Sequence, residues 1–135
     1  MKKKTKNVAP FGPHLMVDAY NCSPKAMNDF ALCYKILDEL PARIGMRKLT
    51  KPYVVFSEGN NHKDPGGWSG FVIIQESHIS LHTFIKRRFV TIDVYSCKNF
   101  NTTLAVNYFK KMFGTKDVEV KIEPRGVRYP DKNLD

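Results

Sequence analysis

A short stretch near the middle of the chain gathers side chains that could do chemistry. Glu76, Ser77 and His78 are consecutive, His82 follows four residues after His78, and Cys97 lies further on. A hydroxyl, an imidazole and a thiol are groups from which proteins build nucleophiles and general acids and bases. Because an imidazole titrates near pH 6.5 and a thiol near 8.5, the first can accept a proton at neutral pH and the second can donate one.

Alternation of apolar and polar residues predicts the strands that position these groups. Residues 69–75, 78–84 and 89–97 have the composition of strands, with a bend at Glu76 and Ser77. Successive side chains of a strand point to opposite faces, so one face is aliphatic and should pack on helices. The other face would carry His78, Ser80, His82, Thr91, Asp93, Tyr95 and Cys97. A face of this kind is a reactive site, a contact with a second subunit, or an ordinary solvated surface.

Two helices and three further strands complete the predicted fold. One helix should begin at Pro24 after a capping Ser23, and Pro41 should kink or break it. A second helix is expected over residues 102–113. Further strands are expected at residues 14–21, 53–56 and 117–123. This order indicates an α+β fold, a two-layer α/β sandwich with a mostly antiparallel sheet and two helices on one face.

The chain divides into three parts. Residues 1–12 are expected to form a flexible basic arm, residues 13–126 a single domain, and residues 127–135 a tail. The chain has 135 residues, enough for one domain with an ordinary core. No apolar run approaches the roughly 20 residues of a membrane-spanning helix, so we expect no membrane contact.

Charge and cysteine content further limit the kinds of partner, compartment and metal site that we expect. The net charge of +9 comes partly from the lysines of the N-terminal arm and partly from single residues along the chain. We interpret it as a solvated surface rather than a nucleic-acid interface. The three cysteines lack paired spacing, which suits a reducing cytoplasm, and Cys33 is expected in the core. His78 and His82 lie too far apart on an extended strand to chelate one metal, so no metal site is expected.

Several stretches resemble one known family. The segments SGFVIIQESHISLHTF and FVTIDVYSC closely resemble the small prokaryotic S-adenosylmethionine decarboxylases, which depend on a pyruvoyl group. Three more stretches share the resemblance, namely HLMVDAYNC, LDELPARIGM and VEVKIEPRG. Together they cover about residues 12 to 130, in the same order and spacing as in that family.

The resemblance implies that the chain cuts itself. Ser77 would attack the carbonyl group of Glu76, turning the amide into an ester. His82 would then remove the α-proton of Ser77, and Ser69 would assist the processing. Cleavage between residues 76 and 77 would give a β chain, 1–76, and an α chain, 77–135, which begins with the pyruvoyl group.

The same resemblance implies the reaction of the mature enzyme. The pyruvoyl ketone would form a Schiff base with the amine of S-adenosylmethionine and accept electrons as carbon dioxide leaves. Cys97 would return a proton to the substrate α-carbon. The product would serve as an aminopropyl donor for spermidine synthesis, and the enzyme would be a cytoplasmic dimer of processed protomers.

One turn departs from the family pattern. The family commonly has Pro-Glu after the strand that carries the histidine, and that glutamate grips the ribose of the substrate; here the pair is Ile85-Lys86. Lysine cannot accept hydrogen bonds, so a pyruvoyl-dependent arginine or ornithine decarboxylase stays an alternative. A non-enzymatic basic domain that binds nucleic acid or a protein is a more distant one. The candidates for an aromatic stack on the adenine ring are Trp68, Tyr53 and Phe56, and Lys86 is a further candidate for a contact with the substrate.

Overall fold

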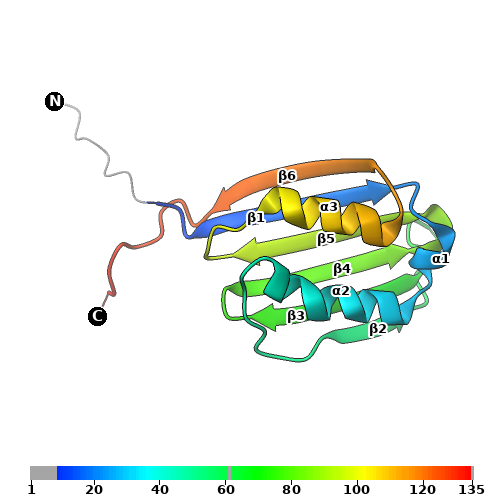
Figure 1. The fold of residues 1–135 in the computed structure, drawn as a ribbon, viewed down its shortest axis with the longest axis horizontal. Helices are drawn as coiled ribbons and strands as arrows, with labels where there is room; N and C mark the ends of the chain where they lie inside the picture. Colours follow the sequence, from blue (N-terminus) through cyan, green and yellow to red (C-terminus); the bar gives the residue numbers. More distant parts are fainter. Residues whose placement is uncertain (1–8, 61, 135) are drawn as a thin grey trace.

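A single antiparallel sheet of six strands, in the order β2-β3-β4-β5-β1-β6, organises the computed structural model, which describes residues 9–60 and 62–134. The strands are β1 Gly12–Tyr20, β2 Tyr53–Ser57, β3 Gly67–Ile74, β4 Ser77–Phe84, β5 Phe89–Ser96 and β6 Asp117–Arg125. The helices are α1 Pro24–Met27, α2 Phe30–Arg43 and α3 Thr102–Phe113, and a 3₁₀ turn covers Ile85–Arg87. Figure 1 shows this arrangement. The predicted α+β sandwich is confirmed.

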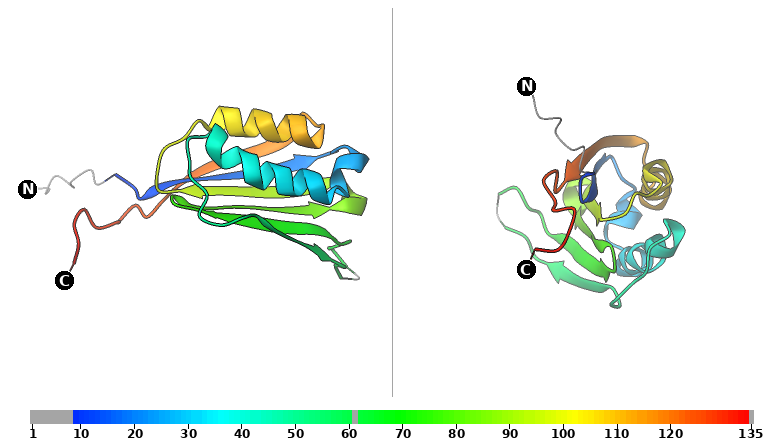
Figure 2. Two further views of the ribbon diagram at one scale, coloured as in Figure 1. Left: turned by 60° about the horizontal axis from the view of Figure 1, so that its bottom comes forward. Right: turned by 90° about the vertical axis from the view of Figure 1, so that its left-hand side faces the viewer.

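The helices cover only one face of the sheet. Helix α2 packs on β3 and its neighbours, and α3 packs on β1. The side view in Figure 2 shows both helices on the same side of the strands. No helix formed by the described residues covers the opposite side of the sheet, which is called the open face below (Figure 2).

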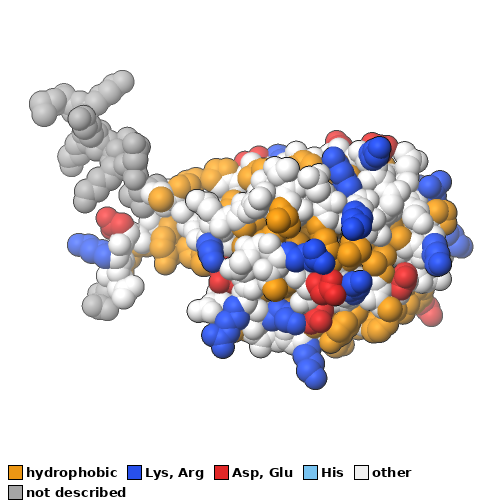
Figure 3. Space-filling model, in the orientation of Figure 1, with side chains coloured by type: hydrophobic (Ala, Val, Ile, Leu, Met, Phe, Trp, Pro, Cys, Tyr) orange, Lys and Arg blue, Asp and Glu red, His pale blue; other side chains and the backbone are white. Residues whose placement is uncertain are grey.

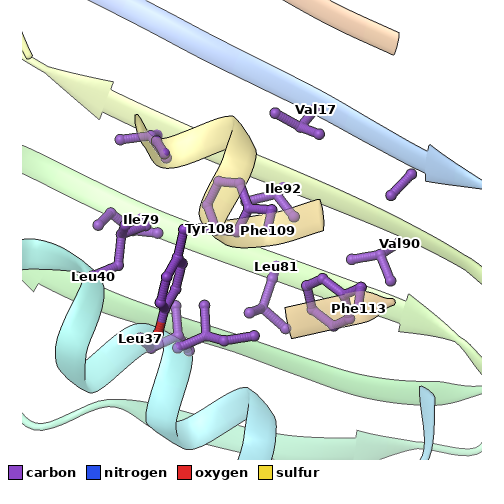
Figure 4. Packing of buried hydrophobic residues seen from close by; sticks show 14 of the residues in the cluster. Val17, Leu37, Leu40, Ile79, Leu81, Val90, Ile92, Tyr108, Phe109 and Phe113 are labelled. Atoms are coloured by element: carbon purple, nitrogen blue, oxygen red, sulfur yellow. The ribbon is translucent and has the colours of Figure 1, made fainter. Parts of the chain in front are cut away.

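The core lies between the sheet and the two long helices. Alternate residues of the central strands point into it, and all five predicted inward residues of β4 and β5 are at most 1% exposed. These residues are Ile79, Leu81, Val90, Ile92 and Val94. Figure 4 shows Phe109 and Phe113 of α3 and Leu37 and Leu40 of α2 packed around them. The alternation in the sequence therefore identified the buried face correctly.

The predicted first helix is two helices. Helix α1 is one turn long, and α2 begins afresh because the side chain of Asp29 accepts a hydrogen bond from the N–H of Leu32 at 2.9 Å. The expectation that Pro41 breaks the helix is wrong: Pro41 lies buried inside α2, which continues to Arg43. Near the end of a helix a proline interrupts only one backbone hydrogen bond, and burial of its ring in the core offsets part of that loss.

The ends of the domain differ slightly from the prediction. Strand β1 begins at Gly12, two residues earlier than expected, and β6 runs on to Arg125. Residues 1–8 of the predicted arm lie outside the described residues. In the predicted tail, residues 127–134 form no helix or strand, and the Tyr129 ring lies 4.8 Å from that of Phe11.

The helix side of the surface carries charges of both signs. Figure 3 shows lysine and arginine side chains spread over this side, with aspartate and glutamate among them. Within the described residues, no helix is long and apolar enough to cross a membrane.

The cap at Asp29 gives a test of the helix boundary. Asp29→Ala removes the acceptor for the N–H of Leu32 and should lower the free energy of unfolding by about 1 kcal/mol. Urea denaturation measures this, and Asp131→Ala is the control because Asp131 is exposed in the C-terminal segment. If α1 and α2 were one continuous helix, alanine would be the better residue at position 29 and the variant would gain stability.

Candidate functional site

The hairpin between β3 and β4 places Ser77 in an unusual backbone conformation. Ile74 pairs with Ser77, so only Gln75 and Glu76 form the turn. Ser77 has a φ of 151°, which residues other than glycine rarely adopt. Such conformations cost on the order of 1–3 kcal/mol and persist only where the surroundings enforce them. The strain lies at the N–Cα bond of Ser77, directly after the peptide bond that joins Glu76 to Ser77.

Hydrogen bonds hold this turn from both sides. The N–H of Cys97, just after β5, donates to the carbonyl oxygen of Glu76 at 2.8 Å. From the other side, the N–H of Arg47 donates to the Glu76 side chain at 3.2 Å, and the Arg47 carbonyl accepts the N–H of Gln75 at 2.9 Å. The contact from Cys97 polarises the same carbonyl group that an attack by Ser77 would need, because an N–H aimed at a carbonyl oxygen stabilises negative charge there.

A second group of polar residues lies further along β4. Ser69 of β3 is paired with His82 of β4, and the His82 Nδ1 lies 2.8 Å from the Ser69 Oγ. His82 is exposed and Ser69 is partly buried. The hydroxyl fixes the orientation of the ring, and the exposed imidazole can exchange a proton with a group that approaches the open face.

The two groups are separated within one protomer. His82 lies five residue steps along β4 from Ser77, and at about 3.3 Å per step the two are roughly 17 Å apart. The structure therefore brings together Glu76, Ser77 and Cys97, called the junction group below. It also brings together Ser69 and His82, but it does not bring the two groups into contact in a single chain.

Of the three cysteines, Cys97 is the accessible one. Cys97 is exposed, whereas Cys22 and Cys33 are fully buried. Burial raises the pKa of the Cys22 thiol to about 11 and that of the Cys33 thiol to about 12. The core position predicted for Cys33 is confirmed, and neither buried thiol ionises appreciably near neutral pH.

The open face also holds polar contacts that sequence reasoning missed. His14 of β1 lies 2.7 Å from a carboxylate oxygen of Asp93 on β5. The Tyr95 ring lies 5.8 Å from that of His14 and 5.6 Å from that of His78. The pKa of Asp18, on the same face, is raised. The main cause is its partial burial, and the nearby carboxylates of Glu119 and Asp93 add to the effect. Alternation along residues 14–21 could have placed His14 on this face, but only the β1–β5 pairing reveals its partner.

The three aromatic residues predicted as candidates to stack on the adenine ring lie on different faces of the sheet. The Trp68 indole N–H donates to the side chain of Asn28 at 3.2 Å, and its ring contacts Phe30 and Phe56 at centroid distances of 5.3 and 5.0 Å. Trp68 and Phe56 thus lie on the helix side of the sheet edge. Tyr53 is paired with Phe71, and the ring centroids of this pair are 5.8 Å apart. Of the three candidates, the structure places only Tyr53 on the open face with Ser69 and His82.

Lys86 lies in the 3₁₀ turn after β4, four residues beyond His82, with its side chain exposed. It forms no ion pair with any residue that the structure describes. The described residues also contain no cluster of three histidine, cysteine, aspartate or glutamate side chains that could hold a metal ion.

Comparison with known proteins identifies the family. A family model described as S-adenosylmethionine decarboxylase matches residues 13–126, most of the chain. The chain belongs to the S-adenosylmethionine decarboxylase family. A proenzyme of that name from Geobacillus kaustophilus is 31% identical over 117 residues, which are 87% of this chain and 89% of the relative. The one from Pyrococcus horikoshii is 32% identical over 124 residues, or 91% of this chain and 84% of the relative.

A solved structure supports the fold assignment. The crystal structure of the adenosylmethionine decarboxylase from Aquifex aeolicus matches with a TM-score of 0.75 and covers 94% of this chain and 100% of that one. The two sequences are 21% identical, so this match carries the fold alone. The predicted family and the α+β architecture are confirmed by these comparisons.

The burial of the thiols predicts selective modification. We expect iodoacetamide at pH 8 to alkylate one thiol per folded chain, Cys97, and to label all three after unfolding. The reason is that Cys22 and Cys33 are buried and have raised pKa values. Peptide mapping by mass spectrometry locates the label, and a Cys97→Ser variant should remain unlabelled when folded. Equal labelling of Cys22 would contradict the packing described above.

Proposed function

We propose that this protein is a self-processing, pyruvoyl-dependent S-adenosylmethionine decarboxylase. The observation that carries the proposal is the hydrogen bond from the Cys97 N–H to the Glu76 carbonyl oxygen, directly beside the strained Ser77. Family membership supports the reaction type. The three unpaired cysteines suit the reducing cytoplasm, where we place the enzyme.

Self-cleavage would begin at the junction group. The Ser77 Oγ attacks the carbonyl carbon of Glu76, and the negative charge on the oxygen is stabilised by the Cys97 N–H. The hydroxyl proton passes to the nitrogen of residue 77, and the C–N bond breaks. Glu76 is then an ester on the Ser77 oxygen, and residue 77 has a free amine. This step releases the constraint on the φ of Ser77, so part of the backbone strain favours the reaction.

The ester is resolved by removal of a proton. His82, oriented by Ser69, takes the α-proton of residue 77, and the bond between the Cβ of residue 77 and the ester oxygen breaks, which frees the Glu76 carboxylate. Hydrolysis of the remaining dehydroalanine releases ammonia. A pyruvoyl group at position 77 supplies a ketone that binds an amine and withdraws electrons during decarboxylation. The exposed Cys97 thiol, beside position 77, is then the group that donates a proton to the substrate α-carbon.

The roughly 17 Å between Ser77 and His82 in one chain favours a site shared by two chains. The open face suits this contact, because its β2–β3 half is apolar: Tyr53, Val55, Phe71 and Ile73 are each between 36% and 59% exposed there. Two copies packed face to face about a two-fold axis can bring the His82 of one chain to the Ser77 of the other. The axis would run between the two sheets, across the direction of β4 and opposite Ser80, which is about midway between Ser77 and His82, and it would create two equivalent sites.

The function is tested by mass and by carbon dioxide release. The purified protein should consist of fragments 1–76 and 77–135, the second beginning with pyruvoyl, and it should release carbon dioxide from carboxyl-labelled S-adenosylmethionine. Ser77→Ala should stay whole and inactive because it lacks the attacking hydroxyl. Ser23→Ala is the control and should cleave normally, because the Ser23 hydroxyl makes no capping hydrogen bond to α1 and lies away from the open face. Release from arginine or ornithine instead would establish the alternative substrate, and a wild-type chain that stays intact would exclude self-processing.

Subunit mixing tests the shared site. Neither Ser77→Ala nor His82→Ala should cleave alone, but a mixed dimer has one complete site. Its Ser77 comes from the His82→Ala chain and its His82 from the other. Refolding the two variants together should therefore cleave about half of the His82→Ala chains and none of the Ser77→Ala chains, if subunits mix freely. Intact mass distinguishes the chains, and replacing the Ser77→Ala partner with a Ser77→Ala/His82→Ala chain should abolish cleavage. Absence of cleavage in the first mixture would place each site within one protomer.

A further inference from the structure

The turn after β5 is built around a buried hydroxyl. Ser96, the last residue of β5, is 0% exposed. Its Oγ donates to the carbonyl oxygen of Lys98 at 2.7 Å and accepts the Lys98 N–H at 2.9 Å. Two hydrogen bonds to one residue two positions ahead close a tight loop, and Cys97 lies at the tip of this loop.

We propose that Ser96 is a positioning residue for both steps of the reaction, a proposal that rests on the function proposed above. The loop held by Ser96 directs the Cys97 N–H to the Glu76 carbonyl oxygen while the Cys97 thiol stays exposed. The backbone amide of Cys97 serves self-cleavage, and its thiol serves decarboxylation. Ser96 touches neither the reacting peptide nor the substrate, so it acts through the backbone of its neighbour.

Two further contacts fix the same loop. The start of β1 crosses it so closely that a Cβ on Gly12 would overlap the carbonyl oxygen of Ser96 and lie 2.6 Å from the Cα of Cys97. The ammonium group of Lys98 donates to the carbonyl oxygen of Gly45 at 2.8 Å, just after α2. The chain from Gly45 leads directly to Arg47, which binds the Glu76 turn. Residues 45–47 therefore contact both the loop after β5 and the turn that contains Glu76.

A buried hydroxyl can find a hydrogen-bond partner without holding a loop as Ser96 does. Thr83 is the other buried polar residue among those described, and its Oγ1 accepts the N–H of Trp68 at 2.9 Å. Thr83 lies near the far end of β4, away from the junction group. It bonds to the backbone as Ser96 does, without touching a loop that carries a reacting group. Thr83→Val is therefore a matched control for the loss of one buried hydroxyl.

The first experiment compares rates of self-cleavage. Freshly refolded precursors are followed by intact mass at a temperature where every variant is folded. Ser96→Ala should cleave at least about tenfold more slowly than wild type, because a misplaced donor loses much of its stabilisation of the oxyanion. Thr83→Val should cleave at the wild-type rate despite a similar loss in Tm. Equal slowing in both variants, or none in Ser96→Ala, would overturn the proposal.

The second measurement concerns the cleaved enzyme. Per pyruvoyl group, Ser96→Ala should lose about tenfold or more in kcat with little change in KM, since the displaced thiol acts after the substrate is bound. Cys97→Ala should separate the two roles of that residue. It keeps the amide and should still cleave, but it should decarboxylate poorly. A Cys97→Ala chain that fails to cleave while remaining folded would contradict the role of the amide, and an unchanged kcat for Ser96→Ala would contradict the positioning of the thiol.

The third measurement does not depend on the reaction. In the uncleavable Ser77→Ala background, the amide hydrogen of Cys97 should exchange with solvent more than about tenfold faster when Ser96→Ala is added, with core amides unchanged. Adding Thr83→Val instead should leave the exchange of the Cys97 amide unaltered. Unchanged exchange on adding Ser96→Ala would overturn the proposal even in an active enzyme. Failure of the wild-type chain to cleave would contradict the proposed function. The exchange rate of the Cys97 amide would then decide by itself whether Ser96 positions that amide.

Discussion

One backbone hydrogen bond, from the N–H of Cys97 to the carbonyl oxygen of Glu76, connects the fold to its chemistry. It extends the β4–β5 pairing by one step beyond Ser77 and Ser96. Because the bond continues a sheet ladder, the register of the central strands brings the N–H and the carbonyl group opposite each other, and the loop held by the Ser96 hydroxyl keeps the N–H directed at the oxygen. A donor held in this way needs little reorganisation when charge develops on the oxygen it faces.

The strained φ of Ser77 follows from the same constraint. The turn of Gln75 and Glu76 is held to Arg47 on one side and to Cys97 on the other. The chain must still enter β4 in register with both β3 and β5. In the structure Ser77 meets both requirements with a φ of 151°. A cost of roughly 1–3 kcal/mol is tolerable in a domain whose aliphatic core is fully buried.

The sequence predicted the faces of the strands better than it predicted the distances between groups. Period-two alternation placed Ile79 and Leu81 in the core and His82 on the open face, because burial depends on local pattern. It could not reveal that Ser69 lies opposite His82, since that depends on the length of the turn between β3 and β4. The break before α2 was missed for a similar reason, because the apolar stripe continues through Asp29 and only the side-chain cap marks the new start.

The topology explains why a chain cut before Ser77 would stay in one piece. The first fragment would contain β1, β2, β3, α1 and α2, and the second β4, β5, α3 and β6. In the sheet order β2-β3-β4-β5-β1-β6, strand β1 lies between β5 and β6. Separating the fragments would therefore break three strand pairings, β3–β4, β5–β1 and β1–β6, and would expose the core residues that α2 and α3 share. Self-cleavage can thus free the backbone at position 77 while the hydrogen bonds that hold the junction group remain in place.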